Sequence, residues 1–243
     1  MIQDNIIIIP DVHGRSFWKE AVEKYPLEQF IFLGDYLDPY PDEGFSEGEA
    51  FQGLQEIVRF KEEHPGKVTL LWGNHDLHYL YPEMMGSRYD IRHAERNARF
   101  FSDHQTLFNM AYETQVAGKR FLFSHAGVGR GWIRSNWPSF LMDELSAELF
   151  NGLTGYPGFM SALGDVSAYR WGDQPYGSMV WADCHEQMEG QNRLPGIIQI
   201  FGHTLTDKPS NFDDAAYCLD CCTCFYLDGA DGTVRYLNDG RPV

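Results

Sequence analysis

Residues 70–76 read LLWGNHD, in which an apolar run ends at Gly73 and is followed at once by an amide, an imidazole and a carboxylate. The apolar run predicts a buried strand, so the three polar side chains lie just past the end of that strand. In an open α/β sheet, ligands bind in the crevice beyond the carboxyl ends of the strands. The position of Asn74, His75 and Asp76 therefore favours a functional site.

The same construction occurs four more times along the chain. Apolar runs at residues 6–9, 30–33, 121–123 and 197–201 are followed by PDVHG (10–14), GDYLD (34–38), SHAG (124–127) and GHT (202–204). Apolar residues at helical spacing in residues 15–25 and 51–63 separate the first three strands, and this alternation predicts an α/β fold. Residues 112–117 and 120–124, joined by Gly118-Lys119, predict a hairpin, which adds antiparallel pairing to the second half.

The composition excludes several classes of partner. The chain has 243 residues, of which 43% are hydrophobic, enough for the core of one large α/β domain. Lys and Arg number 19 against 35 Asp and Glu, and the net charge of -16 disfavours nucleic acid as a bulk partner while it suits the binding of cations. The amino terminus lacks a basic leader and no run of 18 apolar residues occurs, so we expect no membrane partner and a cytoplasmic location.

Four of the five cysteines lie within residues 217–225. A structural zinc site normally takes its second pair of ligands from a separate knuckle, and Cys184 stands alone. The aromatic and aliphatic neighbours favour buried cysteines of a strand near residues 216–227. A metal or redox role for these cysteines is the alternative.

The residues at the predicted strand ends are oxygen and nitrogen donors without a thiolate. They are Asp11, His13, Asp35, Asn74, His125 and His203. Such donors suit Mn²⁺, Fe or Zn. One such residue alone more often caps a helix or completes a turn, so the argument depends on the recurrence at five strand ends. Asp35 could touch two metal ions through its two carboxylate oxygens.

Taken in order over residues 11–204, the motifs DxHG, GDxxD, GNHD, HAG and GHT resemble those of the calcineurin-like metallophosphoesterases. The chain is most similar to the phosphoprotein phosphatases and their bacterial relatives. The resemblance implies an α/β fold with a two-sheet β-sandwich core of mixed parallel and antiparallel strands, flanked by helices in four αββα layers. It implies a single domain over residues 1–243, with residues 77–110 and 130–195 as helical or loop insertions near the site.

The resemblance also implies a role for each residue of the site. Asp11, His13 and Asp35 would bind a first metal ion, and Asp35, Asn74, His125 and His203 would bind a second. His75 would be the general acid that protonates the leaving oxygen, and Asp38 would orient it. A metal-bridging hydroxide would attack phosphorus in line. The implied cofactors are two divalent or trivalent ions, with Mn²⁺ expected and Fe or Zn as alternatives.

Two arginines that hold the substrate phosphate in this family are missing from the expected positions. Pro39 replaces one and Asp183 replaces the other. Arginines that could replace them are Arg88, Arg92, Arg96, Arg99 and Arg170. Their position soon after His75 favours Arg88 and Arg92 as substrate-binding residues, and a solvated helix face is the alternative interpretation of this basic cluster.

These residues lead to three functional hypotheses. The first is a metal-dependent phosphatase that hydrolyses phosphomonoesters of a substrate still to be identified. The second keeps the metal ions but cleaves the phosphoanhydride of a dinucleoside polyphosphate. The third is a non-catalytic metal-containing module that binds a phosphorylated ligand. The presence of His75 and Asp38, which serve turnover rather than folding, favours an enzyme.

Overall fold

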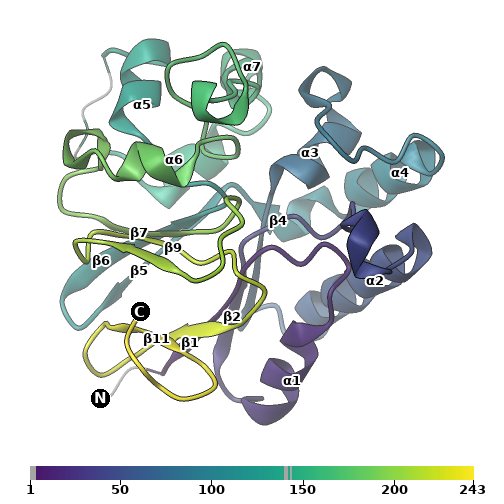
Figure 1. The fold of residues 1–243 in the computed structure, drawn as a ribbon, viewed down its shortest axis with the longest axis horizontal. Helices are drawn as coiled ribbons and strands as arrows, with labels where there is room; N and C mark the ends of the chain where they lie inside the picture. Colours follow the sequence, from purple (N-terminus) through teal and green to yellow (C-terminus); the bar gives the residue numbers. More distant parts are fainter. Residues whose placement is uncertain (1–3, 140–141, 143) are drawn as a thin grey trace. The chain divides into compact units, whose positions relative to one another are not determined.

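The computed structural model describes residues 4–139, 142 and 144–243 (Figure 1). The chain forms two compact units. Unit 1 comprises Met1–Asn109 and Cys222–Pro242, and unit 2 comprises Met110–Cys221 with Val243. Each unit contains one sheet and its own helices.

The sheet of unit 1 has the order β11-β10-β1-β2-β3-β4. Its strands are β1 (Ile6–Ile9), β2 (Gln29–Phe32), β3 (Val68–Leu71), β4 (Phe108–Asn109), β10 (Phe225–Leu227) and β11 (Val234–Tyr236). Strands β1 to β4 are parallel, with Ile6 opposite Gln29 and Phe30 opposite Val68, whereas β10 is antiparallel to both β1 and β11. The parallel strands bring the polar residues that follow β1, β2 and β3 to the same edge of the sheet.

The helices of unit 1 are α1 (Phe17–Lys24), α2 (Glu47–Glu63), α3 (Asn74–Leu80) and α4 (Ala94–His104), with short 3-10 turns η1 (Pro41–Glu43), η2 (Pro82–Met84) and η3 (Gln105–Leu107). The helices predicted within residues 15–25 and 51–63 are α1 and α2. Helix α2 begins earlier than predicted because Ser46 and Glu49 form a capping box there. Its buried face, which includes Leu54 and Val58, packs on the side of β3.

The sheet of unit 2 has the order β5-β6-β7-β9-β8. Its strands are β5 (Ala111–Val116), β6 (Lys119–Ser124), β7 (Ile198–Phe201), β8 (Ser210–Phe212) and β9 (Ala216–Cys218). The predicted hairpin is β5 and β6, whose turn residues Ala117 and Gly118 both have positive φ. Strands β6, β7 and β9 are parallel, and β8 is antiparallel to β9.

The helices of unit 2 are α5 (Arg130–Asn136), α6 (Ala147–Gly152) and α7 (Pro157–Leu163), with 3-10 turns η4 (Ala168–Arg170), η5 (Cys184–Gln187) and η6 (Gly190–Asn192). All of them fall within the predicted insertion 130–195, of which residues 140, 141 and 143 lie outside the described part. The other predicted insertion, 77–110, extends into strand β4 of unit 1. The single domain over residues 1–243 stays a prediction.

Two mixed sheets flanked by helices confirm the predicted α/β fold class. The strand predicted near residues 216–227 is instead two strands, because β9 belongs to the sheet of unit 2 and β10 to the sheet of unit 1. Of the cysteines between them, Cys218 and Cys224 are buried as predicted, whereas Cys222 is exposed, with φ 59°. Within the described ranges, no helix has both the length and the hydrophobicity that crossing a membrane requires.

Candidate active site

The loop after β1 presents Asp11 and His13, which are both buried. Nδ1 of His13 lies 2.7 Å from the carbonyl oxygen of Leu37. Because a carbonyl only accepts, Nδ1 carries the proton and Nε2 keeps its lone pair, 3.5 Å from Oδ2 of Asp35. Burial lowers the pKa of His13 to about 3, although the charge of Asp35 opposes this shift. The neutral imidazole therefore offers Nε2, the atom that could bind a metal ion.

The loop after β2 is tied to the loops on both sides of it. The carbonyl of Asp35 accepts the backbone N–H groups of Val12 (3.0 Å) and His13 (2.8 Å), and its Oδ1 accepts the N–H of His75 (2.9 Å). His13, Asp35 and Asp38 have φ values of 45°, 55° and 59°, in the left-handed region. The strained backbone of these loops points their side chains toward one another.

Three donors from these loops converge. One ligand atom each from Asp11, His13 and Asp35 can be chosen so that all lie within 4.8 Å of one another. Two carboxylates and a neutral imidazole, all buried, are the donor set that Mn²⁺, Fe or Zn accepts, so these residues fit a metal ion. Asn74, the fourth predicted ligand of unit 1, is buried at the first position of α3.

Asp76 joins the ends of β2 and β3. Its carboxylate accepts the backbone N–H groups of Gly73 (2.8 Å), Asp35 (2.9 Å) and Tyr36 (3.0 Å). A Cβ atom at residue 73 would lie 2.1 Å from Oδ1 of Asp35, so only glycine fits there. Asp76 therefore has a structural role, and Asn74 and His75 are the residues of this motif that could take part in chemistry.

The carboxylate of Asp38 lies at the centre of a buried polar group. Nδ1 of His75 lies 2.7 Å from its Oδ2, the contact that the predicted orienting role requires. Two residues that the sequence analysis missed also reach it, because Nε2 of His78 lies 2.8 Å from Oδ2 and the hydroxyl of Tyr79 donates to Oδ1. Burial raises the pKa of Asp38, but the interactions with His75 and His78 outweigh it and hold this pKa below its usual range.

The two arginines favoured by the sequence lie in different surroundings. Nη1 of Arg88 donates to the backbone carbonyl of Asp38 (2.5 Å), and Nη2 lies 3.1 Å from Nε2 of His75. The guanidinium carbon of Arg88 also lies 3.7 Å from the centre of the Tyr40 ring. Arg92 is exposed and lines a surface hollow with Arg96 and Arg99. The contacts therefore single out Arg88.

In unit 2, His125 follows β6 and His203 follows β7, the neighbouring parallel strand. Both imidazoles are buried, and Nε2 of His125 lies 3.1 Å from Nδ1 of His203. The N–H of Gly202 donates to the carbonyl of His125 (2.8 Å), which holds the two loops together. Two ring nitrogens that face each other in this way form a pair suited to a cation.

Asp183, which lies where the resemblance predicts an arginine, has partners within unit 2. Its Oδ2 lies 3.4 Å from Nη1 of Arg170, and its Oδ1 lies 2.5 Å from Nδ1 of His185. Asp183 also caps η5 through the N–H of His185. This carboxylate and Arg170 therefore form a local pair, and the predicted substitute Arg170 is engaged here.

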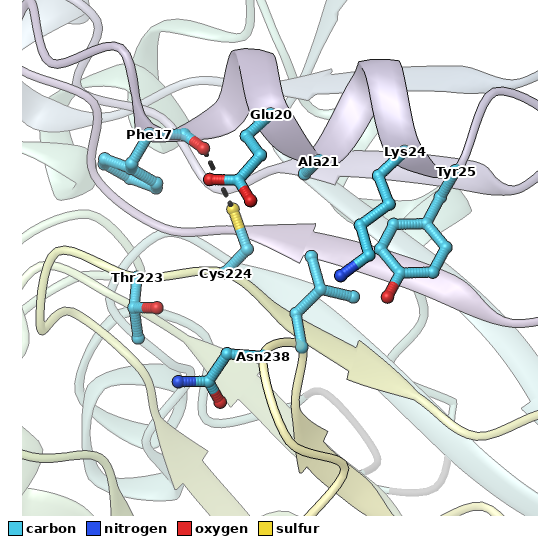
Figure 2. A pocket seen from close by; sticks show the side chains of 9 residues that line it. Phe17, Glu20, Ala21, Lys24, Tyr25, Thr223, Cys224 and Asn238 are labelled. Atoms are coloured by element: carbon cyan, nitrogen blue, oxygen red, sulfur yellow. Dashed lines mark hydrogen bonds between the residues drawn. The ribbon is translucent and has the colours of Figure 1, made fainter.

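A cavity elsewhere in unit 1 accounts for one of the cysteines. Figure 2 shows this cavity, which has a volume of about 150 Å³ and lies between α1 and the segments of Cys224 and Asn238. The thiol of Cys224 lies 4.0 Å from the carbonyl oxygen of Phe17 (Figure 2). Burial, with a smaller contribution from the charge of Glu20, raises the pKa of Cys224 to about 12. This thiol stays protonated near neutral pH, which disfavours the redox role considered for it.

Comparisons with known proteins agree with this geometry. The model of the family described as calcineurin-like phosphoesterase matches residues 5–207. The serine/threonine-protein phosphatase 6 catalytic subunit of Drosophila melanogaster is 23% identical over 206 residues, which are 83% of this chain and 57% of that protein. The chain therefore spans little more than half the length of this relative.

Two solved structures share the fold. A cold-active protein tyrosine phosphatase matches with a TM-score of 0.58 and 16% identity, over 98% of this chain and 80% of that one. A protein serine/threonine phosphatase from Saccharomyces cerevisiae matches with a TM-score of 0.54 and 14% identity, over 94% and 74% of the two chains.

Proposed function

The chain belongs to the calcineurin-like phosphoesterase family, and from this premise we propose that it is a hydrolase of phosphomonoesters that uses two bound metal ions. The observation that carries the proposal is the arrangement at the ends of β1, β2 and β3. There the carboxylates and the imidazole that could bind a metal ion lie next to His75. The backbone N–H of His75 donates to Asp35, and its ring contacts the buried carboxylate of Asp38. Ligands and a proton donor side by side are what phosphate ester hydrolysis requires.

The proposed metal ligands are the oxygen and nitrogen donors that follow the strands. Asp11, His13 and Asp35 would hold one ion, and Asp35, Asn74, His125 and His203 would hold the other. The bound ions would supply charge neutralisation at the phosphate and a water molecule of lowered pKa. Oxygen and nitrogen donors support Mn²⁺, with Fe or Zn as alternatives.

His75 is the proposed general acid. Because its Nδ1–H is directed at Asp38, Nε2 is the atom that would deliver a proton to the leaving oxygen. In the structure Nε2 accepts from Nη2 of Arg88, so it would carry that proton only when Arg88 has turned to the phosphate. Asp38 fixes the tautomer and the plane of the ring.

Arg88 is the proposed phosphate-binding residue that takes the place of the arginine missing at position 39. Its guanidinium lies 3.1 Å from Nε2 of His75, next to where the leaving oxygen would lie. The Tyr40 ring and the carbonyl of Asp38 hold it there, and part of the side chain remains exposed. A planar guanidinium can then donate to two phosphate oxygens.

The test uses the purified chain loaded with Mn²⁺, Fe²⁺ or Zn²⁺ and a panel of phosphorylated metabolites, phosphopeptides, aryl phosphates and dinucleoside polyphosphates. We expect release of inorganic phosphate from monoesters and loss of activity in chelator. Arg88→Met should raise the KM about 10- to 100-fold by removing charged hydrogen bonds, with Arg92→Met as the matched control. Nucleoside mono- or diphosphates produced only from dinucleoside polyphosphates would show the anhydride hydrolase instead, and tight phosphate binding without turnover would show a binding module.

A further inference from the structure

The side chains on one face of helix α3 contact the carboxylate of Asp38. His75, His78 and Tyr79 are spaced three and four residues apart, so their side chains lie on one side of the helix. All three reach the same carboxylate, His75 and His78 at Oδ2 and Tyr79 at Oδ1. Only His75 has a part in the proposed reaction.

The two additional side chains are held rigidly themselves. The imidazole of His78 is fully buried and Tyr79 is 3% exposed. The ring of Tyr79 stacks on Tyr89, with centroids 5.0 Å apart, and His78 meets Tyr89 edge-on at 4.9 Å. The hydroxyl of Tyr79 also accepts the N–H of Asp90 at 3.2 Å, which fixes the direction of its own proton toward Asp38.

A carboxylate that contacts only one imidazole can turn about its side-chain bonds. The hydroxyl of Tyr79 donates to Oδ1 and Nδ1 of His75 lies at Oδ2, while Nε2 of His78 lies 2.8 Å from Oδ2, so polar contacts on both oxygens define the plane of the Asp38 carboxylate. Oδ2 then lies 2.7 Å from Nδ1 of His75, and the opposite nitrogen of that ring, Nε2, lies 3.1 Å from Nη2 of Arg88. Buried polar groups of this kind specify one arrangement because each alternative leaves a donor unsatisfied.

We propose that His78 and Tyr79 are positioning residues, which act through Asp38 to aim the imidazole of His75 at the leaving oxygen. This role rests on the proposed function, because it presupposes that His75 delivers a proton. The proposal predicts that substitution of His78 or Tyr79 lowers kcat most for substrates whose leaving oxygen needs that proton.

Leaving-group dependence distinguishes this role from packing. An alkyl phosphate such as phosphoserine needs protonation of its leaving oxygen, whereas 4-nitrophenyl phosphate leaves as a stabilised anion. Tyr79→Phe, which keeps the ring and removes the donor, should lower kcat on phosphoserine on the order of tenfold and kcat on 4-nitrophenyl phosphate less than about twofold. The KM values and the metal content should not change. Tyr89→Phe is the matched control, which alters a ring of the same stack and should leave both rates unchanged.

Two further variants test the mechanism. His78→Leu should act like Tyr79→Phe, and His78→Gln should restore most of the rate on phosphoserine because its amide N–H can replace Nε2. In a His75→Asn background, Tyr79→Phe should have no further effect on phosphoserine turnover, because the group it positions is gone.

Several outcomes would overturn the proposal. Equal losses on both esters together with a lowered Tm would show a structural role, and so would an additive loss in the His75→Asn background. A wild-type enzyme that hydrolyses both esters while Tyr79→Phe keeps its full rate on phosphoserine would leave the proposed function intact and remove the positioning role. A correctly loaded wild type that hydrolyses neither ester would remove both.

Discussion

The strand ends of unit 1 and unit 2 hold their imidazoles in different ways. In unit 1, the proton of His13 is fixed by a backbone carbonyl and Asp35 is tied to the N–H of His75. In unit 2, the rings of His125 and His203 face each other through ring nitrogens 3.1 Å apart. From this difference in partners we expect the loops of unit 1 to keep their geometry without a metal ion better than the loops of unit 2 do.

Removal of the metal ions should have the largest effect and tests this comparison directly. Chelation should lower kcat by more than about 10⁴-fold, because the nucleophile and the charge neutralisation are lost together. Amide hydrogen exchange should then rise more at residues 124–128 and 201–205 than at residues 9–15 and 72–76. Equal exchange in the two sets of loops would break the comparison.

Loss of the general acid should have the next largest effect. His75→Asn should lower kcat by about 10²- to 10⁴-fold while the bound metal stays at its wild-type content, because the ring supplies a proton and no ligand. Steady-state kinetics and metal analysis of the same preparation measure both quantities. A parallel loss of metal would mean that the ring supports the metal site instead.

Substitution of one glycine in each unit compares the same loops by their effect on the free energy of unfolding. At Gly73 a Cβ atom would lie 2.1 Å from Oδ1 of Asp35, whereas at Gly127 in unit 2 its nearest neighbour would be the ring of Phe201 at 3.2 Å. Gly73→Ala should therefore lower the free energy of unfolding by about 3 kcal/mol. Gly127→Ala should lower it by about 1 kcal/mol, mainly through its φ of +85°. Urea denaturation of the metal-free variants measures this. Gly53→Ala in the interior of α2 is the control without a clash, because its Cβ meets open space, and it should raise the free energy of unfolding by about 0.5–1 kcal/mol.

The smallest expected effect concerns a carboxylate of unit 1 that lacks the donors given to Asp38. Burial, and then the charges of Asp38 and Asp90, raises the pKa of Glu47 from 4.5 to about 7. Between these values the folded state binds more protons than the unfolded state, so stability is greatest at low pH and falls as the pH rises from about 5 to 8. Because the side chain is partly exposed, we expect a contribution of only about 1 kcal/mol.

Glu47→Gln should flatten this part of the stability profile measured by urea denaturation. The exposed Glu62→Gln, near the other end of α2, should not. A wild-type profile that rises over this range after subtraction of the Glu47→Gln profile would contradict the assigned sign.

Parts of the molecule that depend on local pattern could be predicted from the sequence. The apolar runs before each motif form β1, β2, β3, β6 and β7, because buried parallel strands are apolar on both faces. The assignment of Asp11, His13 and Asp35 to one metal ion came from the resemblance to the family, and the structure brings one ligand atom of each within 4.8 Å of the others.

The parts that could not be predicted depend on contacts between distant residues. The role of Tyr79 requires Asp38, 41 residues earlier, although the spacing of His75, His78 and Tyr79 on one helix was a signal that could have been used. Arg88 reaches Asp38 across 50 residues through a left-handed turn that no local pattern announces. Strand propensity near residues 216–227 marks extended chain, but it does not show that the chain leaves one sheet and enters the other.

The left-handed backbone at His13, Asp35 and Asp38 has a consequence for directed evolution. The left-handed conformation costs on the order of 1 kcal/mol for most residues other than glycine. Glycine adopts it freely, and asparagine and aspartate adopt it at a lower cost than other residues do. Libraries selected for heat resistance alone should therefore accumulate glycine or asparagine at position 13 early, since that exchange relaxes the turn. Heat-selected clones would then lose turnover before they lose their fold, and a screen that retains catalysis has to be applied in every round.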